Sequence, residues 1–275
     1  PTGEFELLAA DMGQGHAVMV RTATHALLYD TGPRYSSETD AGQRVLVPLL
    51  RALGEQLDRV IISHQDSDHS GGAPAVLAMQ PQADVLTSMV PEHPLRMKYP
   101  MQTCMAGQEW TWDGVHFSLL HPLEKDYTRD LSPNANSCVL RLQSASGQVA
   151  LLVGDIEAPQ ERELLARHNA SKDTFNAPMQ SPLKATWLLV PHHGSATSST
   201  TEFLQAVQPD IALVQAGYRN RYGHPRADVM ARYDDIQALV VQTTRCGASK
   251  WQSERPIMVH CARDEQQRYW HHRLP

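Results

Sequence analysis

The sequence of 275 residues lacks any long hydrophobic run. Its apolar stretches are short, such as Ala150-Leu151-Leu152-Val153, whereas a helix needs roughly 20 apolar residues to cross a bilayer. No signal-peptide pattern is present either, since Pro1-Thr2-Gly3-Glu4 leads directly into a strand-like run. Apolar residues make up 41% and charged residues 20%, as in soluble globular proteins. Because the first residue is not Met, we expect a piece excised from a longer protein.

Cysteine is scarce, and none of the four cysteines forms a C-x-x-C pair. This excludes a zinc-ribbon pattern but does not fix the redox compartment. Cys104 and Cys138 carry no local signal. Cys246 and Cys261 are on strand-like segments that could pair as a hairpin, so a disulfide and two free buried thiols both remain open.

Positive charge is also lacking, because the formal net charge is −6. This argues against nucleic-acid binding by attraction to the whole protein. It leaves room for a local basic track, and bound divalent cations would add positive charge at a site.

Histidine, in contrast, is abundant, with 14 residues. The densest pattern is His64-Gln65-Asp66-Ser67-Asp68-His69, which follows the apolar run Val60-Ile61-Ile62 and precedes Ser70-Gly71-Gly72. A buried strand that opens into a tight loop can point four such side chains into one small volume. Imidazole and carboxylate groups are the ligands of divalent metals, and hydrolases often hold two ions. The alternative is a polar loop with chance histidines.

Hydrophobic periodicity predicts short strands first and a strand–helix alternation later. The first part contains strands over 4–9, 16–22, 26–30, 59–63 and 83–88, helices over 43–53 and 72–79, and a loop over 89–106. Asp113-Gly114 predicts a hairpin turn within 110–120. Further strands are expected over 137–143, 148–154, 185–190, 210–216, 238–244, 256–262 and 268–271, with helices over 159–168, 201–207 and 226–233 and a polar loop over 169–183. We therefore predict a single α+β domain over residues 1–275, with two sheets face to face and helices outside.

Several motifs occur in the order found in the metallo-β-lactamase superfamily. They are Asp30-Thr31-Gly32, the loop from His64 to His69, Gly154-Asp155, Pro191-His192-His193-Gly194-Ser195 and Gly223-His224-Pro225. The resemblance implies an αββα sandwich, two mixed sheets flanked by helices, with metals at the sheet edge. Further strings resemble one branch, the C-terminal soluble domain of the ComEC family of DNA-uptake channels. They are Asp11-Met12-Gly13-Gln14-Gly15, Asn136-Ser137-Cys138-Val139-Leu140 and the stretch from Ala216 to Pro225.

The residues and the resemblance together suggest a ligand set. Alternate residues of the loop face the same way, so His64 and Asp66 suit one ion while Asp68 and His69 suit a second. The resemblance makes Asp155 the carboxylate that bridges both ions. It also places His224 at the last ligand position, although His224 could instead be a helix-capping loop residue.

Two departures from the superfamily pattern replace nitrogen with oxygen. Asp66 stands where a second histidine is usual, and Asn134-Ala135-Asn136 stands where a further one is usual. Asn136 is thus a candidate ligand or a residue that supports one. Oxygen ligands suit hard ions, so we expect two divalent ions, with Mn²⁺ favoured over Mg²⁺ or Zn²⁺. Alternatively, the first position is weak and only the second fills.

The expected chemistry is metal-dependent hydrolysis of a phosphodiester. Asp68 is the candidate to orient the nucleophile, and His192 and His193 are candidates to protonate the leaving oxygen or contact the phosphate. Either histidine could instead be structural. Asp30, at a strand end, is expected to hold the ligand loop rather than bind metal.

DNA is the expected substrate, with single strands favoured. Tyr218, Arg219, Arg221 and Tyr222 place aromatic and guanidinium groups beside His224, which suits phosphate pairing and base stacking. The same pattern also fits packed tyrosines with solvated arginines.

The resemblance implies a nuclease that degrades the non-imported strand during natural transformation. The domain would be monomeric when isolated. In the full chain it would adjoin the membrane channel, at the periplasmic or extracellular face of the inner membrane. Two rivals remain: a small-molecule hydrolase of thioesters or lactones, and a non-catalytic module that steers DNA into the channel.

Overall fold

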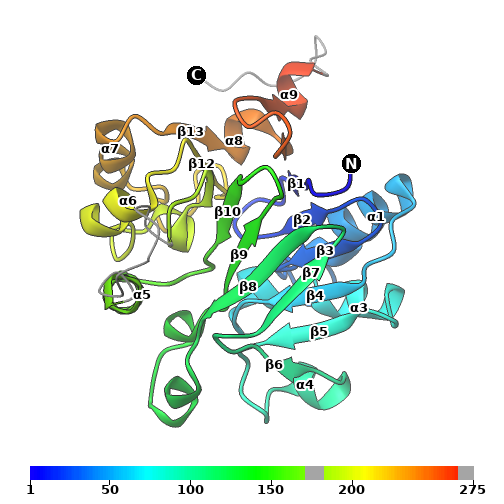
Figure 1. The fold of residues 1–275 in the computed structure, drawn as a ribbon. Helices are drawn as coiled ribbons and strands as arrows, with labels where there is room; N and C mark the ends of the chain where they lie inside the picture. Colours follow the sequence, from blue (N-terminus) through cyan, green and yellow to red (C-terminus); the bar gives the residue numbers. More distant parts are fainter. Residues whose placement is uncertain (171–182, 266–275) are drawn as a thin grey trace.

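Two mixed β-sheets lie face to face in the computed structural model, which describes residues 1–170 and 183–265 (Figure 1). The eight-stranded sheet has the spatial order β15 (Val259–Cys261), β14 (Ser249–Gln252), β1 (Glu6–Ala9), β2 (Val18–Arg21), β3 (Ala26–Tyr29), β4 (Arg59–Ile62), β5 (Asp84–Thr87) and β6 (Gln102–Thr103). The seven-stranded sheet has the order β13 (Leu239–Gln242), β12 (Ile211–Val214), β11 (Trp187–Leu189), β10 (Val149–Leu152), β9 (Val139–Gln143), β8 (Val115–His121) and β7 (Glu109–Trp112).

Helices cover the outer faces of both sheets, as the αββα prediction requires (Figure 1). On the first sheet lie the π-turn η1 (Gly42–Leu46), α1 (Val47–Leu53) and α3 (Ala73–Met79). On the second sheet lie α5 (Ala158–Ala170), α6 (Thr201–Val207) and α7 (Ala227–Asp235). The shorter helices are α2 (Ser67–Ser70), α4 (Pro94–Lys98), η2 (Glu124–Thr128), η3 (Asn134–Asn136), η5 (Pro191–Gly194), α8 (Thr243–Cys246) and α9 (Ala262–Glu265). Among the described residues, no helix is both long enough and apolar enough to cross a membrane.

The central core fills the space between the sheets because alternate strand residues point inward from both of them. Leu7 and Tyr29 of the first sheet meet Phe117, Leu140 and other buried residues of the second.

Parallel pairing brings the ends of several strands to the same edge of the sandwich. In the first sheet β3 and β4 are parallel, with Leu28 opposite Val60, so the segments that follow the two strands start at the same edge of the sheet. In the second sheet β10 and β11 are parallel, with Leu151 opposite Leu188. The polar motifs that follow these strands therefore meet at one edge. Asp and His side chains from different segments must come together in this way if they are to bind a metal.

The segment 89–106, predicted as a loop, contains α4 and β6. Pro94 at the first helical position and His93, whose ring accepts from the Leu95 backbone N–H, start this short helix without any apolar period. Strand β14 was not anticipated. The predicted strand 268–271 and most of the predicted loop 169–183 lie outside the described residues.

The four cysteines form two disulfides, Cys104–Cys138 and Cys246–Cys261. Their Cα atoms are 6.2 Å and 4.6 Å apart, respectively. The placement of Cys246 on a strand was wrong, because it ends the helical turn α8. Strands β14 and β15 do form a hairpin, with Ser249 opposite Cys261, so Cys246 reaches its partner from just before that hairpin.

Shortening a central side chain tests this packing. Leu140 is fully buried between the sheets, so Leu140→Ala should lower the free energy of unfolding by about 2–5 kcal/mol. Leu239 on the edge strand β13 is 53% exposed, and Leu239→Ala should change it by less than about 0.5 kcal/mol. Urea denaturation followed by circular dichroism measures both, and equal losses would contradict the packing described.

Candidate metal centre

The loop that begins at His64 leaves β4, turns through α2 and closes at Gly71 and Gly72. A Cβ on Gly71 would lie 2.1 Å from the backbone nitrogen of Arg34, and one on Gly72 would lie 2.3 Å from the carbonyl oxygen of Thr31. Only glycine allows backbones to approach so closely. The Gly-Gly pair therefore fixes the loop against the segment that follows β3.

Asp30 is fully buried at the end of β3, in the left-handed conformation with φ 60°. Its carboxylate accepts hydrogen bonds from the Ser63 backbone N–H at 2.6 Å and from the Ser63 hydroxyl at 2.9 Å. The same carboxylate lies 2.8 Å from Nδ1 of His69. This contact holds one imidazole proton on Nδ1, so a metal would bind Nε2 by displacing the second proton of the charged ring.

His64 is oriented in a similar way. Its Nδ1 lies 3.0 Å from the Ser63 hydroxyl and 3.4 Å from the Ser137 hydroxyl. Its Nε2 is buried, has no hydrogen-bond partner in the described part of the chain and lies 3.6 Å from an Asp66 oxygen. Asp66 itself is 45% exposed, so this pair opens toward solvent.

His192 and His193 occupy strained positions, with φ values of 50° and 55°. Each such conformation costs of order 1–3 kcal/mol and persists only where the surroundings impose it. His193 is buried, its Nδ1 lies 2.7 Å from the Gln215 carbonyl, and its Nε2 lies 3.2 Å from an Asp68 oxygen. His193 thus has the geometry of an oriented ligand.

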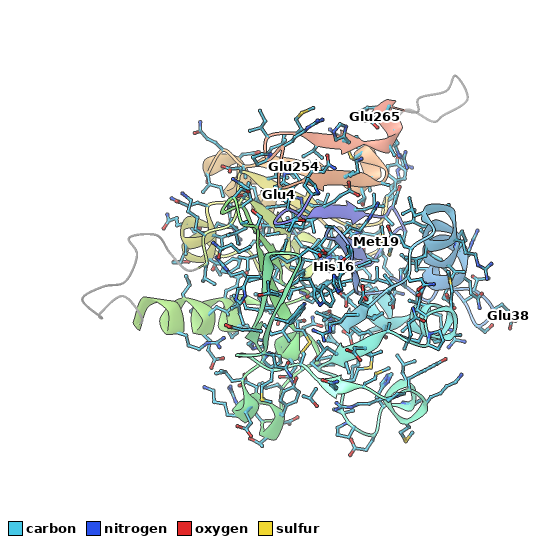
Figure 2. The ribbon with its side chains drawn as sticks, turned by 45° about the vertical axis from the view of Figure 1, so that its right-hand side comes forward. Glu4, His16, Met19, Glu38, Glu254 and Glu265 are labelled. Carbon is cyan, nitrogen blue, oxygen red and sulfur yellow. A yellow bond between two sulfur atoms is a disulfide. The ribbon has the colours of Figure 1, made fainter. Side chains whose placement is uncertain are left out.

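His16 was not among the residues that the sequence singled out. It is fully buried in the interior of the molecule (Figure 2). Its ring centroid lies 4.1 Å from that of His193 and 4.9 Å from that of His69, and neither of its nitrogens has a hydrogen-bond partner among the described residues. Burial, followed by the neighbouring His193 and His69, holds its pKa well below the ordinary value, so the ring is neutral. The signal was its position directly after Gly13-Gln14-Gly15 and two residues before the buried strand β2.

Asp155 lies at the centre of these rings. Its Oδ1 lies 3.2 Å from Nε2 of His69 and 3.8 Å from Nδ1 of His16, while its Oδ2 lies 3.6 Å from Nε2 of His193. Burial alone would raise the pKa of Asp155, but the positive charges of His69 and His193 outweigh it and hold the pKa well below the ordinary value. The carboxylate is therefore ionised and available to bridge cations.

Four groups from four different segments have ligand atoms that all lie within 4.8 Å of one another: His16, His69, Asp155 and His193. Several buried atoms here have no hydrogen-bond partner among the described residues: both nitrogens of His16, Nε2 of His64, His69 and His193, and Oδ1 of Asp155. Each unsatisfied buried polar group costs about 1–3 kcal/mol. A divalent metal would satisfy them, so the donor set fits one.

The remaining expected ligands lie on the more open side. His224 is partly buried, and its ring stacks near His193 at 6.4 Å. Burial, and then His193 and His192, lower its pKa to about 4. Asn134 and Asn136 each have a buried side-chain oxygen without a partner, and the Asn134 amide nitrogen lies 3.4 Å from Nε2 of His192.

Next to the cluster, exposed aromatic and basic side chains alternate. Tyr218 and Tyr222 are each 49% exposed. The Arg219 guanidinium lies 5.2 Å from the Tyr218 ring centroid, and that of Arg221 lies 4.8 Å from the Tyr222 centroid. The Tyr222 ring stacks on His224 at 5.7 Å. The tyrosines are thus not packed into a core, and Tyr222 is joined to the metal-capable rings through His224.

The family profile for the metallo-beta-lactamase superfamily matches residues 10–218. This chain belongs to the metallo-beta-lactamase superfamily. The match spans His16, His69, Asp155 and His193, which are the residues that the fold brings together at the sheet edge.

Relatives of this metallo-beta-lactamase chain include competence proteins. It is 35% identical to competence protein ComA of Neisseria gonorrhoeae, 33% identical to recombination protein 2 of Haemophilus influenzae and 29% identical to ComE operon protein 3 of Bacillus subtilis. These matches cover 90%, 90% and 93% of this chain but only 32%, 28% and 34% of the relatives. The chain therefore spans about a third of the length of the curated relatives it matches.

Solved structures support the fold. The metallo-beta-lactamase fold protein YhfI of Bacillus subtilis aligns with a TM-score of 0.55 at 12% identity, covering 91% of this chain and 100% of YhfI. The metallo hydrolase Igni18 of Ignicoccus hospitalis aligns with a TM-score of 0.52 at 14% identity, covering 90% and 98% of the two chains.

The buried Asp30 carboxylate provides a test of the metal centre. In Asp30→Asn the amide can donate to Nδ1 of His69, which moves the imidazole proton to Nε2 and blocks the lone pair that faces the cluster. We expect divalent-metal affinity, measured by isothermal titration calorimetry, to fall about 10–100-fold.

The matched control is Asp58→Asn. The Asp58 carboxylate accepts from the Ala26 backbone N–H at 2.9 Å, at the opposite end of β3. The Asp58→Asn variant should leave metal affinity unchanged, and thermal unfolding checks that both variants fold. Unchanged affinity in a folded Asp30→Asn protein would contradict the assignment.

Proposed function

We propose that this chain is one metal-dependent nuclease domain of a larger membrane protein for DNA uptake, and that it degrades the strand that is not imported. One observation carries the proposal: exposed Arg–Tyr pairs lead through His224 to a buried His/Asp cluster with unpartnered ligand atoms. A phosphate-binding track beside a metal centre suits a single DNA strand. The competence relatives support DNA rather than a thioester or lactone as the substrate.

In this proposal His64, Asp66, Asp68, His69, Asp155 and His224 hold two divalent ions, with Mn²⁺ favoured. His193, buried with its Nε2 facing Asp68 and Asp155, acts as a further ligand rather than as a proton donor. Asn136, whose buried side-chain oxygen has no hydrogen-bond partner among the described residues, would be a further ligand or support one, and Asp30 orients His69. Divalent ions bound there would activate water and neutralise the phosphate oxygens.

The other steps fall to side chains that line the cluster. Asp68, whose side chain is 29% exposed, can both ligate and orient the attacking water. His192 is 20% exposed, and its Nδ1 lies 3.2 Å from the Thr197 hydroxyl and 3.4 Å from a Glu157 oxygen. These contacts aim Nε2 toward the cluster, where it can protonate the leaving oxygen.

The disulfides Cys104–Cys138 and Cys246–Cys261 favour an oxidising compartment. We therefore place the domain at the outer, periplasmic or extracellular, face of the inner membrane. The rest of the channel protein would be its partner in the full chain, and the isolated domain would be a monomer.

Replacing the candidate nucleophile-orienting residue tests the reaction. Asp68→Ala should lower Mn²⁺-dependent cleavage of single-stranded DNA by about 10²–10⁴-fold, because it removes both a ligand and the group that positions water. A fluorescent oligonucleotide assay measures the rate, and Asp235→Ala on the exposed end of α7 is the control. Full activity of Asp68→Ala, with contaminating nuclease excluded, would overturn the mechanism. Thioester turnover without DNA cleavage, or salt-dependent DNA binding without turnover in saturating Mn²⁺, would support the two rivals instead.

The Tyr–Arg track is tested by binding. Tyr222→Ala should weaken single-stranded DNA binding about 5–150-fold, since stacking of one base on an aromatic ring contributes about 1–3 kcal/mol. Fluorescence anisotropy in Ca²⁺, a hard ion used here to slow cleavage, measures the affinity. The control is Tyr99→Ala, because Tyr99 also has a cationic neighbour: the Lys98 Nζ lies 5.3 Å from the centroid of its ring. Equal affinities of the two variants would remove Tyr222 from the DNA track.

A further inference from the structure

His16 adds an imidazole that the expected ligand set did not contain, and it divides the centre into two unlike parts. We propose that His16, His69, His193 and Asp155 form a nitrogen-rich position selective for a borderline ion such as Zn²⁺, whereas His64 and Asp66 form an oxygen-rich position for Mn²⁺ or Mg²⁺. The inference deepens the proposed function and rests on its metal centre, but not on its substrate.

The nitrogen-rich position is closed to solvent. His16 and His69 are 0% exposed, His193 is 1% exposed and Asp155 is 3% exposed. Their ligand atoms lie within 4.8 Å of one another. Three imidazoles with one further ligand is a donor set that Zn²⁺ takes in tetrahedral geometry, and imidazole suits borderline ions in general.

His16 is also fixed independently of any ligand. Its backbone N–H donates to the Asp68 carbonyl at 3.1 Å, and its own carbonyl accepts from the Gly32 N–H at 2.8 Å. The next residue, Ala17, donates to the Gln215 side chain at 3.1 Å. The ring is therefore held among the other imidazoles by its backbone, although both of its nitrogens are unpartnered. A merely structural buried histidine would have at least one hydrogen bond.

The oxygen-rich position differs in both donors and exposure. Its Asp66 side chain is 45% exposed and lies 3.6 Å from Nε2 of His64. Mg²⁺ and similar hard ions keep several waters and bind through one or two carboxylates, so an open position with a single imidazole suits them. The two positions are adjacent, since the His64 ring centroid lies 4.1 Å from that of His69. This division replaces the expectation that hard ions fill both positions equally.

The test measures metal content and spectra rather than cleavage. Wild-type protein stripped of metal and then exposed to equal Zn²⁺ and Mn²⁺ should retain about one zinc per chain after dialysis against a mild chelator. The oxygen-rich position should bind Mn²⁺, which electron paramagnetic resonance detects. Co²⁺ should replace zinc and give the visible absorption of a four-coordinate site, which Mn²⁺ should not abolish.

Two variants separate the positions. His16→Asn should weaken retention of zinc or cobalt by about 100-fold and leave Mn²⁺ binding in place, whereas Asp66→Asn should do the reverse. His116→Asn, on a partly exposed ring of β8, should change neither. Circular dichroism checks folding, and the wild-type measurement stands alone if His16→Asn does not fold. Two ions of one kind held with equal affinity, or a folded His16→Asn protein with unchanged zinc retention, would overturn the inference. Neither result depends on whether DNA is cut.

Discussion

The carboxylate of Asp30, buried at the end of β3, holds together the part of the molecule on which its chemistry depends. It binds the backbone and the hydroxyl of Ser63 and faces Nδ1 of His69, so one charged group joins two parallel strands and sets one imidazole. A buried carboxylate is stable only when such partners surround it. The loop from His64 to His69 is therefore rigid before any ion binds, and the ligand atoms are presented without the cost of ordering them.

Hydrogen bonds also position side chains across the interface between the two sheets. Ser137 precedes the disulfide-bonded Cys138, and its hydroxyl lies 3.4 Å from Nδ1 of His64 and accepts from the Asp155 N–H at 3.0 Å. The Cys138 N–H in turn donates to the Ser63 carbonyl at 2.9 Å. Candidate ligands from both sheets are thus connected by a short series of hydrogen bonds, and the Cys104–Cys138 disulfide constrains the segment that contains Ser137.

Much of this architecture could be predicted from the sequence. The hairpin at Asp113-Gly114, the helix over 201–207 and the strand–helix alternation of the second half followed from turn residues and periodicity, which act locally. The His64 motif could be recognised because its ligands are adjacent in sequence. His16 could not, because its role depends on meeting His193 and Asp155 across two sheets. The helix α4 and the strand β14 were missed for a related reason. Their sequences have no hydrophobic periodicity, and they are stabilised by the segments that they contact.

The buried His/Asp cluster is proposed to be a metal centre to which the Tyr–Arg track brings a DNA phosphate. The most direct measurement is a crystal structure of the protein with Mn²⁺, Zn²⁺ and a short phosphorothioate DNA strand, with anomalous data collected for both metals. We expect one metal peak among His16, His69, His193 and Asp155, a second beside His64 and Asp66, and a phosphate near them whose base stacks on Tyr222. Absence of metal from the cluster, or a strand bound away from Tyr222, would contradict it.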